Sequence, residues 1–130
     1  MLDHDDAIPP ALHQLESAVM DEIWQRGESS VRQVMDAIND GIVKQRAYTT
    51  YMTIMTRLDR KGMLERRREG KTDFYRPLLT RDEYANLRAR AEVDSLVDQY
   101  GEVALAHIAR QMDGLDRGRR RALLRLARKK

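Results

Sequence analysis

The sequence predicts a mainly α-helical chain with one small antiparallel β hairpin, on three observations. Apolar residues recur at intervals of three and four along three successive N-terminal segments, which is the spacing of one face of a helix. Residues 63–77 break that period, are rich in arginine and contain Gly70 near their centre, as a short hairpin would. Aromatic residues are only 5% of the 130 residues, which favours an aliphatic helical core over a sheet sandwich.

The first two helices are marked by their apolar stripes and their ends. The first stripe begins at Leu12, and Gly27 ends that helix. Ser30, followed three residues later by Gln33, predicts a capping box at the start of a second helix whose stripe reaches Ile42. The expected core positions of the two helices are Leu12, Leu15, Val19, Met20, Ile23 and Trp24, then Val31, Val34, Met35, Ile38 and Ile42.

A third helix and the hairpin follow directly. The third helix is predicted over residues 48–61, with Gly62 as its terminator and with Tyr51, Ile54, Met55 and Leu58 on its inner face. Two short strands are predicted at residues 63–69 and 74–77, around a turn that contains glycine. Three helices followed by a basic hairpin is the order of a winged helix-turn-helix, in which the third helix enters the major groove and the hairpin, or wing, reaches the phosphates.

The remaining residues predict a helical dimerisation region. Ala85, Ala89, Val93, Leu96 and Tyr100 are spaced like a short coiled-coil seam, and two further short helices follow breaks at glycine. About fifty residues with such narrow stripes do not bury a core alone, so we expect a partner chain to cover them. The expected dimer-interface residues are Val93, Leu96, Val97, Tyr100, Leu105, Ile108, Met112, Leu123 and Leu124. The predicted organisation is a flexible N-terminal arm at 1–10, a winged helix DNA-binding domain at 11–79 and a helical dimerisation domain at 80–130.

The charged residues are distributed unevenly along the chain. Residues 1–43 contain two basic and nine acidic groups, whereas residues 44–76 contain ten basic and four acidic groups. Residues 81–116 contain four basic and eight acidic groups, and residues 117–130 contain eight basic groups and no acid. Such asymmetry is typical of a protein that binds a polyanion, although a solvated charged face is the commoner cause. The basic C-terminal helix fits a dimer interface with solvated arginines better than a second DNA-binding arm.

Several classes of protein are excluded by composition. With no cysteine, the chain cannot contain a disulfide framework or a cysteine metal site. Its three histidines are far apart, its four serines lie in no nucleophile motif, and no glycine-rich phosphate loop is present, so we expect neither an enzyme nor a bound metal or cofactor. No apolar run approaches the roughly 18 residues of a membrane span and no signal peptide is evident, so we expect a soluble cytoplasmic protein without direct membrane association.

The third helix and the hairpin supply the expected DNA contacts. Threonine is a mediocre helix former, so a threonine-rich outer face indicates a role in recognition better than a merely exposed helix. Threonine hydroxyls bond base edges or phosphates, and threonine and methionine methyl groups pack on thymine methyls. The hairpin arginines bind phosphates or, in the plainer interpretation, protect an edge strand from aggregation. The predicted DNA-binding residues are Lys44, Arg46, Tyr48, Thr49, Thr50, Met52, Thr53, Thr56, Arg60, Arg67, Arg68 and Lys71.

Motifs across residues 12–128 resemble those of the penicillinase-repressor (BlaI/MecI-type) winged-helix repressors. The motifs, in chain order, are Leu15-Glu16, Val19-Met20, Ile23-Trp24, Val31-Arg32-Gln33-Val34, Ala47-Tyr48-Thr49-Thr50, Thr53, Arg57-Leu58, Lys61-Gly62, Gly70, Tyr75 and Pro77. The resemblance implies a homodimer that binds palindromic operators with TACA/TGTA-type half-sites and represses β-lactamase and related genes. In several members a membrane-bound sensor-protease triggers cleavage in the dimerisation region, so the resemblance also implies release by proteolysis in response to β-lactams.

Two positions depart from the family pattern. Tyr51 stands where the family usually has Val or Ile, so the third helix is expected to pack or tilt differently. The cleaved Asn-Phe pair of the family falls near His107 and Ile108, which do not match and which argue against proteolytic release. The copper-responsive relatives carry a cysteine-rich tail that this chain lacks, so copper sensing is not expected. Two alternatives stay open: a winged helix that docks an acidic protein, and a DNA-binding regulator that a ligand releases.

Overall fold

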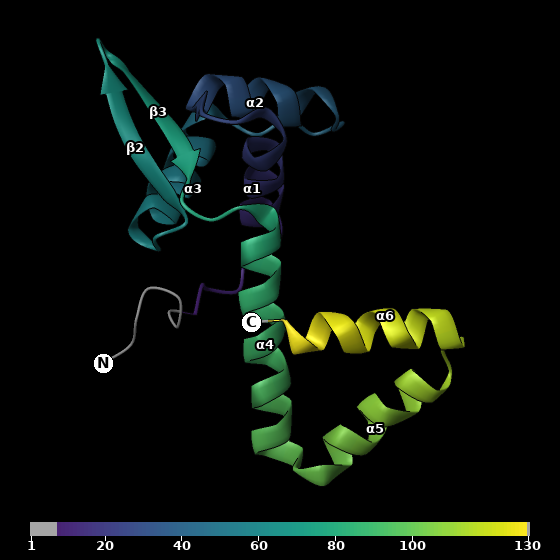
Figure 1. Cartoon of the computed structure of the whole chain (residues 1–130). Helices are drawn as coiled ribbons and strands as arrows, with labels where there is room; N and C mark the ends of the chain where they lie inside the picture. Colours follow the sequence, from purple (N-terminus) through teal and green to yellow (C-terminus); the bar gives the residue numbers. More distant parts are fainter. Residues whose placement is uncertain (1–7, 130) are drawn as a thin grey trace. The chain divides into compact units, whose positions relative to one another are not determined.

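The computed structural model describes residues 8–129, and these form two compact units that divide at Ala89 and Arg90 (Figure 1). The elements of the first unit are α1 (Gln14–Arg26), β1 (Ser29–Ser30), α2 (Val31–Asp40), α3 (Tyr48–Arg60), β2 (Leu64–Glu69), β3 (Thr72–Pro77) and the first half of α4 (Arg81–Tyr100). The second unit contains the rest of α4, then α5 (Glu102–Asp113) and α6 (Arg117–Arg128). The predicted class, mainly helical with a small antiparallel wing, is confirmed. Most of the arm predicted at 1–10 lies outside the described residues.

The helix ends follow the predicted signals. Ser30 Oγ accepts the N–H of Gln33, and the Gln33 side chain accepts the N–H of Ser30, so the capping box is present. Gly62 ends α3 with a φ of +81°, a left-handed conformation that glycine adopts without steric cost. The second helix ends at Asp40, so Ile42 lies beyond it and not on its stripe.

The sheet has three strands in the order β1-β3-β2, all antiparallel. The sequence predicts β2 and β3 but not β1, which has two residues and pairs Ser29 with Tyr75 and Ser30 with Phe74. Ser30 thus ends a strand and caps a helix at once. The β2–β3 hairpin turns at Gly70, whose φ is +63°, and extends beyond the helices (Figure 1).

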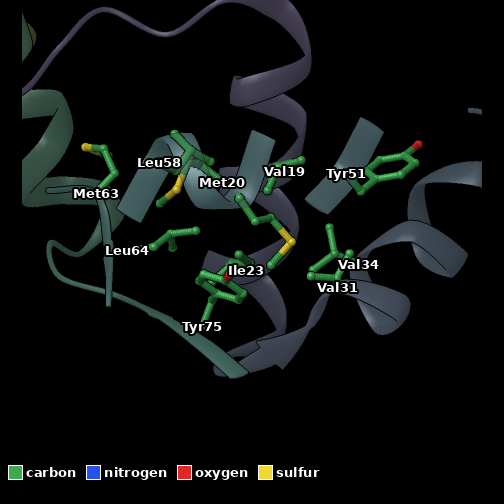
Figure 2. Close-up of a cluster of buried hydrophobic side chains, with 11 residues drawn as sticks. Val19, Met20, Ile23, Val31, Val34, Tyr51, Leu58, Met63, Leu64 and Tyr75 are labelled. Atoms are coloured by element: carbon green, nitrogen blue, oxygen red, sulfur yellow. The ribbon is translucent and has the colours of Figure 1, made fainter. Parts of the chain in front are cut away.

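The core of the first unit lies where α1, α2 and α3 meet the base of the sheet, and Figure 2 shows its buried side chains. Its members come from α1, α2, α3, the residue before β2, and the strands β2 and β3: Val19, Met20, Ile23, Val31, Val34, Tyr51, Met55, Leu58, Met63, Leu64 and Tyr75. The predicted stripe positions Leu12, Leu15, Trp24, Met35, Ile38 and Ile54 are partly buried against this cluster. Burial of a large aliphatic or aromatic side chain contributes roughly 1.5–3 kcal/mol.

The start of α4 is fixed to the rest of the first unit by aromatic and polar contacts. Trp24 Nε1 donates to the Leu79 carbonyl at 2.8 Å, and the Trp24 and Tyr84 rings lie 5.4 Å apart. Tyr84 Oη donates to the Pro10 carbonyl at 3.0 Å, and Arg88 donates to the Pro9 carbonyl at 3.2 Å. Residues 9 and 10, which the sequence assigns to the arm, are therefore anchored on α4.

The second unit contains no buried side chain in the described parts of α4, α5 and α6. Arg120 stabilises the turn between α5 and α6, because its guanidinium donates to the carbonyls of Met112, Asp113 and Leu115. None of the helices within residues 8–129 combines the length and the apolar content that crossing a bilayer requires.

One carboxylate is buried at the foot of α1. Glu16 is 1% exposed, accepts the His13 N–H at 3.0 Å and lies 2.9 Å from Lys61 Nζ at the end of α3. Burial alone would raise the pKa of Glu16, but the His13 hydrogen bond and Lys61 outweigh burial and hold the pKa below its ordinary value of 4.5.

We expect Glu16→Gln to lower the free energy of unfolding by about 1–3 kcal/mol at neutral pH, because hydrogen bonds to charged groups contribute about that much. Since the folded pKa of Glu16 lies below 4.5, this contribution is present above that pH and is lost as the pH falls through the folded pKa. Urea unfolding of both proteins from about pH 7 to about pH 3 measures the difference, which should shrink as the pH falls. A difference that is constant across this range would contradict the assignment.

Candidate nucleic-acid interface

Helix α3 divides its side chains between the core and the exterior. Tyr51, Met55 and Leu58 are fully buried. The opposite face carries the residues predicted to read bases: Thr49, Met52 and Thr53, which are exposed, and Thr50 and Thr56, which are half-buried. A shallow hollow of about 230 Å³ follows this face and is lined by Met52, Thr53, Thr56, Arg57 and Arg60. Hydroxyl and methyl groups in such a hollow can meet both polar base edges and thymine methyls.

A second hollow joins α3 to the start of α2 and to the hairpin. Its volume is about 340 Å³, and it is lined by Ser30, Val31, Arg32, Tyr48, Met52, Lys71, Thr72, Asp73 and Tyr75. Met52 lines both hollows, so the outer face of α3 and the tip of the hairpin border one continuous surface. The Arg32 guanidinium lies 5.9 Å from the centre of the Tyr48 ring, at the first turn of α3.

The register of the hairpin sorts its arginines onto two faces. Arg66 pairs with buried Tyr75, and Arg68 pairs with Asp73, so these four residues share one face of the sheet. Lys71 and Asp73 line the hollow beside α3, so this face is the one that borders it. Asp73 lies between the two cations, with one carboxylate oxygen 3.9 Å from Arg66 and the other 3.9 Å from Arg68.

Arg67 lies on the opposite face of the hairpin and is bound to carboxylates. Its guanidinium is 2.7 Å from Glu28 and 3.1 Å from Glu69, and it stacks 5.2 Å from the centre of the Phe74 ring. The hydrogen bonds to Glu28 and Glu69 raise the pKa of Arg67, and the same bond from Arg67 lowers the pKa of Glu28. A phosphate would have to displace these carboxylates to bind Arg67.

The turn between α2 and α3 brings two further cations to the surface. Lys44 and Arg46 are exposed, and the main chain of Arg46 is bound by the side chain of Asn39. Arg60, also predicted to hold phosphate, is exposed at the end of α3.

The second unit exposes the residues that the sequence assigns to a dimer interface. Val93, Leu96, Tyr100, Leu105, Ile108, Leu123 and Leu124 are exposed, and Val97 and Met112 are half-buried. A mainly apolar hollow of about 410 Å³ lies among Leu96, Tyr100, Val103, Ala104, His107, Ile108 and Gln111.

Residues 12–128 match the protein family described as "Penicillinase repressor". The chain belongs to the penicillinase-repressor family. Membership confirms the resemblance found in the sequence, and the family is one of repressors and not of enzymes.

Two curated relatives are the transcriptional regulator BlaI of Mycobacterium tuberculosis, strains CDC 1551 / Oshkosh and H37Rv. Each is 41% identical over 86 residues, which are 65% of this chain and 59% of the relative. The chain thus matches about three-fifths of the length of these regulators. A solution structure of the DNA-binding domain of the repressor BlaI matches 58% of this chain and 90% of that domain, at 25% identity and a TM-score of 0.51. BlaI of Bacillus licheniformis, solved in its monomeric form in complex with the blaP half-operator, matches with 25% identity and a TM-score of 0.48 over 58% of this chain and 90% of that one.

The DNA-binding residues predicted from the sequence include Arg67, but they do not include Arg32 or Arg66. Counting alternate residues from buried Leu64 would have placed Arg66, and not Arg67, on the face with Arg68. The position of Arg32 beside Tyr48 depends on how α2 and α3 pack, which the sequence does not reveal.

We expect Asp73→Asn to tighten DNA binding by about three- to tenfold, for specific and random duplexes alike. Ion pairs as long as 3.9 Å, with both arginines exposed, contribute little to the order of Arg66 and Arg68. Removal of the negative charge of half-buried Asp73 beside a polyanion frees both cations. Fluorescence anisotropy at several salt concentrations measures the affinity. The affinity of Asp73→Asn should depend more steeply on salt than that of the wild-type protein.

The matched control for Asp73→Asn is Asp21→Asn. Asp21 lies on α1 and pairs with Arg81 of α4, and neither residue lines either hollow. Equal tightening by both variants would show a general charge effect and contradict the placement of Asp73 beside the DNA.

Proposed function

We propose that the chain is a sequence-specific DNA-binding transcriptional repressor that acts as a homodimer on palindromic operators. The observation that carries the proposal is the continuous surface formed by the outer face of α3 and the Lys71–Asp73 side of the hairpin. It combines hydroxyl and methyl groups for base edges with cations for phosphates, and the family and the solved BlaI domain support the same use. A repressor acts where the chromosome lies, so the proposed location is the cytoplasm.

The side chains have two roles in this proposal. Thr49, Thr50, Met52, Thr53 and Thr56 approach the bases from α3. The phosphates are held by cations from the α2–α3 turn, α3 and the wing: Lys44, Arg46, Arg60, Arg66, Arg68 and Lys71. Tyr48 borders the hollow between them and is 42% exposed, so its hydroxyl is available to a phosphate. Arg67 is left out of the phosphate set because Glu28 and Glu69 already bind it.

The homodimer is proposed for the second unit. Its exposed apolar side chains and the absence of any buried residue in the described parts of α4–α6 leave it without a core of its own. A second copy would cover these side chains and would bring two α3 helices to one palindrome.

The proposed release of DNA depends on the dimer interface of the second unit. His107 and Ile108 in α5 do not match the cleaved pair of the family, so cleavage there by a sensor-protease in response to β-lactams requires a protease of different sequence preference. Such a cut would separate the two DNA-binding units and remove the gain from binding two half-sites. Both residues are exposed, and both border the apolar hollow of the second unit, so a ligand that enters this hollow would act on the same contacts.

Selection from a random duplex library, at about physiological salt with competitor DNA, tests the function. One enriched two-fold palindrome is the expected result, because non-specific binding weakens strongly at that salt concentration. Enrichment of a single half-site would support sequence-specific DNA binding but contradict the proposed homodimer. The absence of any enriched sequence would contradict the proposed repressor function.

Thr53→Ala and Lys71→Ala should weaken binding in different ways. Loss of a base contact at Thr53 costs about 1–3 kcal/mol on the selected operator and little on random DNA. Loss of a phosphate contact at Lys71 weakens both duplexes similarly and flattens the salt slope by about one unit. Titrations of both duplexes at several salt concentrations separate the two effects, and wild-type binding by both variants would show that the proposed contacts are not made.

Leu96→Asp should convert the dimer to a monomer, because it places an unpaired charge on the apolar face of α4. Sedimentation equilibrium at micromolar concentration measures the mass, with Val43→Asp, a fully exposed position in the first unit, as the matched control. A wild-type mass of one chain, or a Leu96→Asp mass of two chains, would contradict the interface.

A further inference from the structure

A side chain of α2 bonds both main-chain groups of one residue in the following turn. Asn39 Nδ2 donates to the Arg46 carbonyl at 2.9 Å, and Asn39 Oδ1 accepts the Arg46 N–H at 3.1 Å. The amide thus binds the backbone as a neighbouring strand would, and it closes the residues between 39 and 46 into a loop.

The same amide is held from the other side by α3. Tyr51 is fully buried, and its hydroxyl donates to Asn39 Oδ1 at 2.7 Å. In Figure 2 its ring extends from α3 with the phenolic oxygen at the outer edge of the core cluster. Because Oδ1 accepts two hydrogen bonds while Nδ2 donates one, the orientation of the amide is fixed by its partners.

The loop has few other constraints. Hydrogen bonds from the Gly41 and Ile42 N–H groups to α2 hold its beginning, and within residues 8–129 the main chain of 43–46 is bound only by Asn39. Val43 is fully exposed, and Lys44 and Arg46 project from the same short segment. The path of the chain into α3 therefore depends on Asn39, and the position of Asn39 depends on Tyr51.

We propose that Asn39 and Tyr51 are positioning residues that hold the α2–α3 turn in the conformation in which Lys44 and Arg46 bind DNA phosphates. This inference rests on the function proposed above. A turn that is already ordered loses less conformational freedom on binding, so the two cations bind phosphate at a smaller entropic cost. We define the three side-chain hydrogen bonds of Asn39 as the turn clamp.

The first experiment examines the free protein. Tyr51→Phe keeps the buried ring and removes one bond of the turn clamp, and Asn39→Ala removes all three. Amide hydrogen exchange at Arg46 is expected to quicken about threefold or more in Tyr51→Phe and further in Asn39→Ala, while amides within α1 and α3 keep their wild-type protection. Tyr84→Phe is the matched control, because it also loses one hydroxyl bond to a carbonyl but lies away from the turn. Unchanged exchange at Arg46 in both clamp variants would overturn the inference.

The second experiment measures DNA binding in a double-mutant cycle. Tyr51→Phe is expected to weaken binding to the selected operator by about three- to tenfold, which is the ordering cost of one or two long side chains. In a Lys44→Gln/Arg46→Gln background the same substitution should have almost no further effect, because the side chains through which it acts are gone. A merely structural loss would weaken binding equally in both backgrounds and would overturn the inference, as would wild-type affinity in Tyr51→Phe.

The two proposals fail in distinguishable ways. If the wild-type protein selects no duplex, the repressor function fails and the turn clamp has no DNA-binding role. If the wild-type protein selects an operator and the cycle shows no coupling between Tyr51 and the two cations, the repressor function stands and only the turn clamp is rejected.

Discussion

The packing of one face of α3 into the core is the interaction on which the rest of the first unit depends. Met55 and Leu58 are fully buried there, and they contact a cluster with members in α1, α2 and the sheet. Because a helix turns by about 100° per residue, the burial of these side chains fixes which residues of α3 face outward. The exposure of Met52 and Thr53 follows from it. The residues that stabilise the fold thus also set the orientation of the outer face of α3, which borders the hairpin.

The carboxylates around the hairpin decide which cations are available to a polyanion. Arg67 has the shortest ion pair of the hairpin, at 2.7 Å to Glu28, and would exchange one anionic partner for another on binding DNA. Within residues 8–129, the partners of Arg68 are Asp73 in a 3.9 Å ion pair and the Gly70 carbonyl, so its charge is less compensated. Asp73 sits among the cations of the inner face, where it limits their attraction for any polyanion. A basic strand therefore presents fewer effective charges than its sequence contains.

The sequence predicts well whatever depends on periodicity and local end signals. The three helix stripes, the capping box of Ser30 and Gln33 and the glycine end of α3 follow from neighbours within a few positions. It predicts poorly what depends on contacts between distant segments. The strand β1 exists only because β3 passes beside two serines, and the partner of Arg67 lies 39 residues away in Glu28.

Tyr51 shows the same limit at one position. Its helical spacing predicts burial, and the residue is fully buried. A tyrosine in place of Val or Ile also indicates altered packing of α3, but nothing in the spacing reveals that its hydroxyl reaches Asn39, 12 residues away. The hydroxyl has its polar partner in Asn39 of α2, so no buried hydroxyl is left unsatisfied. Because Asn39 in turn binds the main chain of Arg46, the consequence of the tyrosine lies in the turn before α3.

The described residues of the second unit form no buried core, and this links the folding of the unit to its proposed function. Between residues 90 and 129 it has local order, such as the three carbonyls bound by Arg120, but the described residues of α4–α6 contain no buried side chain. A helical segment of this size gains little from hydrophobic burial on its own, so its apolar residues have most to gain from a second chain. A partner that covers them would add another copy of α3 to the same assembly. The contact that completes the core would then also multiply the affinity for a repeated half-site, so any event that weakens that contact would release DNA without touching the surface that binds it.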